Sequence, residues 1–237
     1  MLVWLAVASA TWSIVAVDPD TEEVGIAGAT CSPMVWFIGG IAPGHGVVAA
    51  QYATSLPHKA DVVDAVVGGA VPAEALAAGL EGDDKVALRQ WAVVGLNGPP
   101  ATFVGEEVEL PARVTTGETW SAQGNTLASE AVVDDAGAAF VDAQGALAER
   151  LLAALEAGAA AGGDSRCDPA DAARSAFLYV AAPGDDARDP TVELRASGAG
   201  AVAELRPRLE AADNSCSQGG GRRWWPWLAL LLMRRRA

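Results

Sequence analysis

Thr11 carries a hydroxyl that could act as a nucleophile, and it directly follows a pattern typical of a cleavage site. The chain opens MLVWLAVASATWSIVAV, and its first ten residues are apolar or small, with no basic residue among them. They end in Ala8-Ser9-Ala10, the small-x-small pattern that a signal peptidase recognises. Cleavage after Ala10 would make Thr11 the new N-terminus. The alternative is that residues 1–10 are a first strand of the fold, since they are short for a signal peptide and lack its basic start.

A terminal threonine differs chemically from an internal one. A threonine hydroxyl is a poor nucleophile at neutral pH and needs a base to accept its proton. A free α-amine, with a pKa of ~7.7–8.0 in peptides, lies on the same residue and can serve as that base. We therefore predict that Thr11 is a catalytic nucleophile once it is the first residue. The alternative is an ordinary strand residue, because threonine is favoured in strands.

Attack on an amide carbonyl also needs hydrogen-bond donors for the oxyanion that develops. Asn125, with Gly124 beside it on an expected tight turn, is the predicted donor pair. Gln123 precedes them and is a predicted substrate-binding residue. The other interpretation of Gln123-Gly124-Asn125 is a turn without a catalytic role.

Three further polar residues are predicted at the same site. Asp164 and Arg166 follow an expected helix end at Gly162-Gly163, where Asp164 would orient the Thr11 amine and Arg166 would hold a substrate carboxylate. Ser32, beyond the second expected strand, is a candidate proton relay. The glycine pair also has a purely structural interpretation, as a helix stop.

Composition excludes several other kinds of chemistry. The net charge is −14, and five of the 16 basic residues are arginines near the C-terminus, so the body is more acidic still and nucleic acid is not an expected partner. The two histidines and three cysteines show no metal-ligand spacing, and no phosphate-binding loop is present. We expect no metal and no cofactor. The sequence predicts no oligomeric state.

The elements that must position these residues alternate between strands and helices. The pattern predicts strands at 11–18, 23–31, 46–53, 89–96, 101–105, 174–182 and 191–196, and helices at 59–68, 72–80, 129–142, 147–161 and 202–212. The strands are nearly all apolar, as expected when both faces of a sheet are covered. Strand blocks that alternate with helix pairs indicate an α+β fold with sheets inside and helices outside.

The sequence of the C-terminal end predicts a cellular location rather than an activity. A polar spacer begins near residue 213, and ten apolar residues, Trp224 to Met233, lie between two arginine clusters. A helix of ten residues rises only ~15 Å, half of a ~30 Å hydrocarbon core. The pattern from Cys216 onward resembles the C-terminal sorting signal of myxobacterial surface proteins, which implies processing near that cysteine and attachment to the cell-envelope membrane. The alternative is a disordered basic tail.

Several stretches of the body together resemble the DUF1028 family, whose members are assigned to the N-terminal nucleophile (Ntn) hydrolase superfamily. As they stand in this chain they are TWSIVAVDPDTEEVGIAGATCS, PGHGVVAAQ, LRQWAVVG, SAQGNTLASEAV and LAERLLAALEAGAAAGGDSR. The resemblance runs from Thr11 to about Glu210 and implies a four-layer αββα sandwich of the Ntn-hydrolase type. In the family the opening threonine follows the initiator methionine. Here cleavage after Ala10 would expose it in the same way.

The chain departs from the family pattern in two places. Pro33 follows Ser32 where the family often has lysine, and SRCDPADAARSAF interrupts the run that follows Asp164. The interruption brings Cys167, which in an envelope protein would form a disulfide with Cys31 if the two lie close together. The alternative is two unpaired thiols.

These observations predict an exported protein in three parts: a signal-like segment at 1–10, a domain at 11–212 and a sorting tail at 213–237. The predicted function is hydrolysis of an amide bond in a small-molecule or peptide-like substrate, at the cell envelope or cell surface. The alternative is a catalytically inactive surface protein that keeps the fold.

Overall fold

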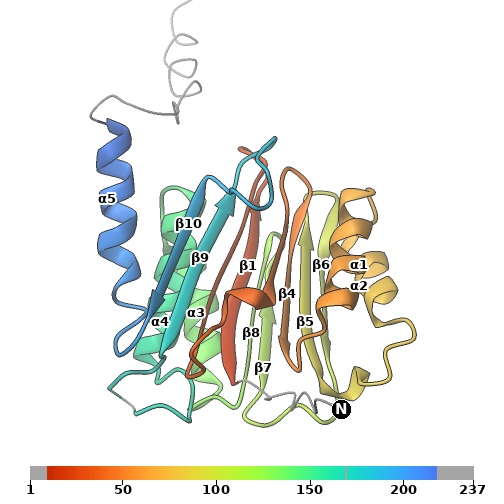
Figure 1. The fold of residues 1–237 in the computed structure, drawn as a ribbon, viewed down its shortest axis with the longest axis horizontal. Coiled ribbons are helices and arrows are strands. Elements are labelled where there is room, and N and C mark those ends of the chain that lie inside the picture. Colours follow the sequence, from red (N-terminus) through yellow and green to blue (C-terminus); the bar gives the residue numbers. More distant parts are fainter. Residues whose placement is uncertain (1–9, 169, 218–237) are drawn as a thin grey trace, which may run out of the picture.

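The structure, a computed structural model, describes residues 10–168 and 170–217 (Figure 1). Six strands form one antiparallel sheet in the order β10-β9-β2-β1-β8-β7, and four form a second in the order β3-β4-β5-β6. The first sheet comprises β1 (Thr11–Asp18), β2 (Glu23–Thr30), β7 (Arg113–Thr116), β8 (Trp120–Asn125), β9 (Ser175–Ala181) and β10 (Val192–Ser197). The second comprises β3 (Gly39–Ala42), β4 (Gly46–Tyr52), β5 (Arg89–Gly95) and β6 (Gly98–Val104).

Five α-helices and two short 3-10 helices complete the described elements. The α-helices are α1 (Leu56–Val67), α2 (Pro72–Leu80), α3 (Ala131–Asp142), α4 (Leu147–Ala160) and α5 (Leu205–Ser217), and the 3-10 helices are η1 (Trp36–Ile38) and η2 (Val86–Leu88). Helices α3 and α4 cover the six-stranded sheet, while α1 and α2 cover the four-stranded one (Figure 1). The α+β prediction is confirmed.

Three apolar clusters fill the spaces between these layers, and the alternation along β1 shows how one strand serves two of them. Trp12 and Ile14 point into the cluster shared with α3 and α4, whereas Val15 and Val17 point into the cluster between the two sheets. The third cluster lies between the four-stranded sheet and the helices α1 and α2. The layers therefore follow the order helix, sheet, sheet, helix. Successive residues of the central strand face opposite layers, as the two-residue period of a strand requires.

Most predicted elements are present, with differences at their ends. The β1–β2 hairpin and α2 have the predicted bounds or end within one residue of them. Helix α1 begins three residues earlier than expected because Pro57 is accepted in its first turn. Helix α5 starts at Leu205 and continues to Ser217, five residues beyond the predicted end.

Strands β3, β7 and β8 were not expected. In β8 the sequence WSAQGN is largely polar and contains a glycine, which gives it low strand propensity, and its Gln123-Gly124-Asn125 segment was interpreted as a turn. That interpretation is wrong, because β8 pairs with β1 on one side and with β7 on the other. Pairing with two neighbours outweighs the local preference of the segment.

The sequence features expected at the two ends fall largely outside the described residues. The signal-like segment at 1–9 and the tail from 218 onward, with its apolar run and arginines, are not described. Cys216 lies in the last turn of α5, and its side chain is also outside the description. Within residues 10–168 and 170–217, no helix has the length and apolar character needed to cross a bilayer.

Candidate functional site

Three strand ends meet at Thr11. This residue begins β1, the strand that lies between β2 and β8, and it is paired in register with Thr30 on one side and Asn125 on the other. Thr30 ends β2 and Asn125 ends β8, so the three residues lie at one edge of the six-stranded sheet. Thr11 is fully buried. Its side chain faces the four-stranded sheet, since it shares the alternation of Val15 and Val17.

The peptide bond before Thr11 has a specific environment. The Ala10 carbonyl oxygen accepts hydrogen bonds from the Thr30 hydroxyl and from Arg166 Nη2, the latter at 3.2 Å. Thr30 Oγ1 itself accepts from the Ser32 amide at 3.2 Å. A hydroxyl has a single proton, and its contact with Ala10 is shorter than its 3.3 Å contact with Asp164 Oδ2, so that proton goes to the Ala10 carbonyl. The carbonyl of the Ala10–Thr11 bond thus lies between a hydroxyl and a guanidinium.

Asp164 holds this pair of donors in place. Its Oδ2 accepts from Arg166 Nη2 at 2.8 Å and from the Cys31 amide at 2.6 Å, while its Oδ1 accepts from the Arg166 amide at 3.0 Å and from Nε at 3.1 Å. The carboxylate is almost fully buried, whereas a third of the Arg166 side chain is exposed. Charge-assisted bonds of this kind are short and directional. Asp164 and Arg166 thus lie beside the peptide bond that precedes Thr11, where Arg166 donates to the Ala10 carbonyl. Their predicted roles, orienting the Thr11 amine and holding a substrate carboxylate, stay predictions.

The glycine pair after α4 explains how Asp164 reaches β2. Gly162 has a φ of 110° and Gly163 a φ of 58°, both in the left-handed region that favours glycine. A Cβ on Gly163 would lie 2.6 Å from the Ala172 carbonyl oxygen and 2.9 Å from the Trp12 ring. The pair ends the helix, as predicted, and turns the chain so that the next residue contacts the end of β2.

A disulfide joins the two segments that carry the donors. Cys31 follows Thr30, Cys167 follows Arg166, and the two cysteines are bonded across a sequence separation of 136 residues with their Cα atoms 5.4 Å apart. The predicted pairing is thus present. The cross-link fixes the loop after Asp164 against the end of β2, next to both groups that contact the Ala10 carbonyl.

A buried polar cluster lies between the sheets beneath Thr11, and we call it the amide network. Its members are Ser13, Gln51, Gln90, Gln123 and Asn125. Ser13 Oγ donates to Gln51 Oε1 at 2.7 Å, and Gln51 Nε2 donates to Gln90 Oε1 at 2.8 Å and to the Thr11 carbonyl at 3.2 Å. The network connects β1 to the second sheet and fixes the main chain at Thr11.

Asn125 and Gln123 belong to this network rather than to a surface turn. Asn125 Nδ2 donates to Gln90 Oε1 at 2.8 Å, and Gln123 Nε2 donates to the Ala49 carbonyl at 3.4 Å. Within the described part of the chain, Asn125 Oδ1 and Gln123 Oε1 have no hydrogen-bond partner. Asn125 is opposite Thr11 in register, so the residue that carries this acceptor is a direct strand neighbour of Thr11. Gly124 separates the two and faces the helices, where a Cβ would lie 2.7 Å from Leu127.

Ser32 lies at the rim of the site. Its hydroxyl is 3.5 Å from Arg166 Nη2, and its carbonyl accepts from Ser175 Oγ at 2.9 Å. The residue is only partly buried, unlike Thr11 and Thr30. Ser32 therefore contacts the guanidinium side of the Ala10 carbonyl and not the amide network.

Three of the four described non-glycine residues with positive φ lie at this end of the molecule, and the fourth, Glu22, lies in the turn at the other end of the β1–β2 hairpin. Tyr52 at the end of β4, Thr126 after β8 and Ala172 after the insertion all have positive φ, at 68°, 49° and 53°. Such conformations cost of order 1–3 kcal/mol each and concentrate at functional sites. Burial, with the nearby Glu109 carboxylate, also raises the pKa of Tyr52. The strain supports a functional role for the edge of the two sheets where Thr11 lies.

Sequence reasoning missed Thr30, Gln51 and Gln90. None of the three was predicted to belong to the site. Each lies in an apolar strand and faces the space between the sheets, where a polar side chain is unexpected. A polar residue within an otherwise apolar strand is therefore the sequence signal that could have identified these three residues.

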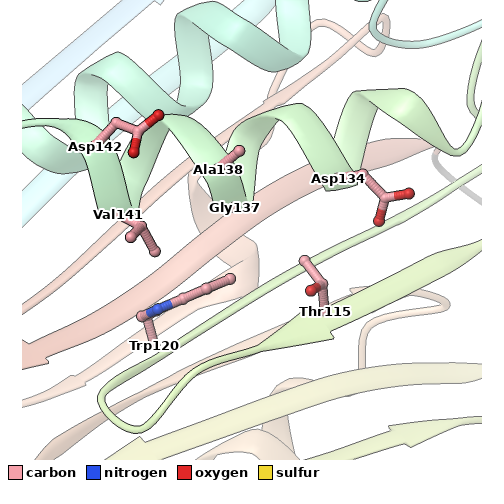
Figure 2. A pocket seen from close by; sticks show the side chains of 7 residues that line it. All are labelled: Thr115, Trp120, Asp134, Gly137, Ala138, Val141 and Asp142. Carbon is pink, nitrogen blue, oxygen red and sulfur yellow. The ribbon is translucent and has the colours of Figure 1, made fainter.

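A groove on the other face of the six-stranded sheet is a separate feature (Figure 2). It has a volume of about 450 Å³ and lies between α3 and the strands β7 and β8. Its lining residues are Thr115, Trp120, Asp134, Gly137, Ala138, Val141 and Asp142. Asp134 is paired with Arg113 Nε at 2.8 Å. Because Trp120 packs on the helical side of the sheet and Thr11 faces the second sheet, the groove is not part of the Thr11 site.

Comparisons with known proteins agree with this architecture. The crystal structure of protein SPO2555 from Silicibacter pomeroyi is similar, with a TM-score of 0.75 and 29% sequence identity over 91% of this chain and 92% of that chain. No curated protein matches this chain. A model for a family of unknown function, DUF1028, matches residues 11–205, which begin at Thr11 and include Thr30 and Arg166, the two described donors to the Ala10 carbonyl. The chain therefore belongs to the DUF1028 family.

Proposed function

We propose that this protein is an N-terminal nucleophile hydrolase that cleaves an amide bond, with Thr11 as nucleophile after the chain is cut between Ala10 and Thr11. The freed α-amine accepts the hydroxyl proton while Oγ1 attacks the amide carbonyl. The tetrahedral intermediate then expels the leaving amine, which takes that proton, and an ester on Thr11 remains. Water, deprotonated by the same α-amine, hydrolyses the ester and restores the free hydroxyl.

The position of Thr11 carries this proposal. It is the first residue of the central strand, its preceding carbonyl is bound by two donors, and an unused acceptor on Asn125 lies opposite it in register. An α-ammonium freed by cleavage needs an acceptor of that kind. The helix, sheet, sheet, helix layering supports membership of the Ntn superfamily, in which the nucleophile opens a strand of an αββα sandwich.

A second candidate function is a surface protein without turnover. One observation favours it: with Ala10 attached, Thr11 is fully buried and Ala10 is only 1% exposed, so the hydroxyl is closed off. A chain that keeps residues 1–10 would have the fold without an accessible nucleophile. The absence of the family's lysine at Pro33 points the same way.

Mass spectrometry of the protein purified from its native host tests the proposal. A chain that begins at Thr11 is expected, and a β-lactone probe should then acylate that residue, as located by peptide mapping. Thr11→Val should abolish labelling, while Thr21→Val, in the exposed turn at the other end of the β1–β2 hairpin, should label normally. A host-derived chain that retains residues 1–10 and stays unlabelled would support the second candidate instead.

We also propose that the protein is exported and held at the cell envelope. The disulfide supports this location, because disulfides persist in oxidising compartments and are rare in the cytosol. The apolar and arginine-rich tail would supply the attachment to the membrane, and an acidic body makes nucleic acid an unsuitable partner. Cell fractionation of tagged protein tests the location, and recovery in the cytoplasmic fraction with both thiols free would contradict it.

A further inference from the structure

We infer that Thr30 and Arg166 bind the carbonyl oxygen of the substrate, and that Ala10 occupies the position of the substrate's acyl residue. The inference rests on the proposed function of Thr11. It identifies the substrate class as an amide whose acyl part ends in a small amino-acid residue such as alanine. It also moves the role of oxyanion donor from Asn125 and Gly124 to two side chains on other elements.

The first step is chemical. In the uncut chain an alanyl group is bonded to the nitrogen of Thr11, and in the acyl-enzyme a substrate acyl group is bonded to its Oγ1. Both atoms lie within two bonds of the same Cα, so the two carbonyl groups occupy neighbouring positions. The Ala10 carbonyl therefore marks where the substrate carbonyl must lie when Oγ1 attacks it.

The second step is electrostatic. The Ala10 oxygen accepts from the Thr30 hydroxyl and from Arg166 Nη2 at 3.2 Å, and these donors would stabilise the negative charge that forms on that oxygen during attack. Neither donor is free to reorient. The Asp164 carboxylate binds Arg166 through both of its oxygens, and the Ser32 amide holds Thr30 Oγ1. Donors fixed in advance are the arrangement that stabilises a transition state most effectively.

The third step excludes the donor predicted from sequence. Asn125 Nδ2 donates to Gln90 Oε1 at 2.8 Å, on the side of the second sheet. The Ala10 carbonyl lies on the side of β2 and Asp164. Asn125 is therefore placed to accept from the Thr11 amine, and the carbonyl oxygen belongs to Thr30 and Arg166.

The fourth step concerns size. Ala10 is 1% exposed, so its methyl side chain is enclosed by the surrounding residues. A larger side chain at this position would have to displace packed atoms, which is unfavourable in an interior of crystal-like density. A substrate with a leucine-sized acyl residue should therefore react more slowly than its alanine counterpart.

Acylation of the processed protein from the native host tests the inference. The reagents are the p-nitrophenyl esters of N-acetyl-L-alanine and N-acetyl-L-leucine, with p-nitrophenolate release and the mass of the Thr11 adduct as readouts. The alanyl ester should acylate Thr11 at least about 10-fold faster, because leucine adds three carbons to the side chain and even one misfitting methylene changes specificity by about 10–200-fold. Equal rates for the two esters would overturn the assignment of the acyl position.

Variants test the two donors separately. Thr30→Val and Arg166→Met should each slow acylation by about 10²–10³-fold, the usual cost of removing one oxyanion donor. Thr30→Ser should restore most of the rate, which shows that the hydroxyl and not the fold is responsible. The matched controls are Thr54→Val, which removes a hydroxyl bound to the Ala50 carbonyl at 2.7 Å, and Arg113→Met, which removes the exposed partner of Asp134. Both controls should react like the parent protein.

A sulfur-substituted reagent distinguishes contact with the oxygen from a general structural role. The parent protein should react more slowly with the thionoester of N-acetyl-L-alanine than with the ester, and Thr30→Val should lose much of that difference. If the β-lactone labels Thr11 but Thr30→Val and Arg166→Met acylate at the parent rate, this inference fails and the proposed function stands. If neither esters nor β-lactone label Thr11 in the processed protein, the proposed function fails, and this inference fails with it.

Discussion

Two arginine–aspartate pairs lie at the same end of the molecule, one on each sheet, and each guanidinium also donates to a main-chain carbonyl. On the four-stranded sheet Arg89 binds Asp83 through Nε at 2.6 Å and Nη2 at 2.9 Å, and its Nη1 donates to the Ala53 carbonyl. On the six-stranded sheet Arg166 binds Asp164 at 2.8 Å and donates to the Ala10 carbonyl at 3.2 Å.

The two pairs differ in how exposed the arginine side chain is and in which part of the chain supplies the carbonyl that the arginine binds. The Arg89 side chain is 6% exposed and its carbonyl belongs to the chain between β4 and α1, so every partner is a permanent part of the fold. The Arg166 side chain is 34% exposed, and its carbonyl belongs to a residue that cleavage would remove. The same chemical group thus holds the fold together in one place and, under the proposed function, would leave a binding position for substrate in the other.

The largest expected effect is on stability and belongs to the Arg89 pair. Arg89→Ala leaves the Asp83 carboxylate buried without its partner, and should lower the free energy of unfolding by about 3–5 kcal/mol. Arg166→Ala should cost less, because water reaches the Arg166 side chain and two main-chain amide donors, those of Cys31 and residue 166, remain around Asp164. Urea unfolding of both variants measures the difference. Equal losses would mean that the two pairs serve the same structural purpose.

The second prediction concerns the Cys31–Cys167 disulfide, which lies next to the Arg166 pair and not next to the Arg89 pair. Replacing Cys31 and Cys167 together by serine should lower the free energy of unfolding by about 2–4 kcal/mol, since the bond closes a long loop. It should also slow acylation of Thr11, because the donors next to both cysteines are then less fixed. A stability loss with an unchanged acylation rate would separate the disulfide from the site.

The smallest expected effect is a pH dependence of the Arg89 pair. Hydrogen bonds from Arg89 lower the pKa of Asp83 below its ordinary value. A lowered carboxyl pKa contributes stability that is present above the ordinary pKa and is lost as the pH falls through the lowered one.

The stability difference between the parent protein and Asp83→Asn should therefore hold from neutral pH to about pH 5 and shrink in more acidic solution. Urea unfolding at a series of pH values measures it. A difference that grows on acidification would contradict the assigned sign.

Much of the fold could be predicted because its strands and helices carry local signals. The apolar runs of β1, β2, β4, β5 and β9, the proline at the start of α2 and the glycines after α4 all act within a few residues. Strand β8 could not be predicted in this way, since its Gln-Gly-Asn segment is extended only through pairing with β1 and β7. Thr30 was missed for a related reason: nothing near it in sequence shows that Arg166 lies beside it.

By itself, the sequence determined that Thr11 follows a small-residue cleavage pattern, that the body alternates strands with helices, and that the two body cysteines are available to pair. Only the tertiary structure decided which groups surround the Ala10 carbonyl. Thr30 and Arg166 are 136 residues apart and contact the same oxygen because β2, the turn after α4 and the disulfide meet at one sheet edge. Contacts of that kind depend on long-range pairing and packing, which a local pattern of side chains does not encode.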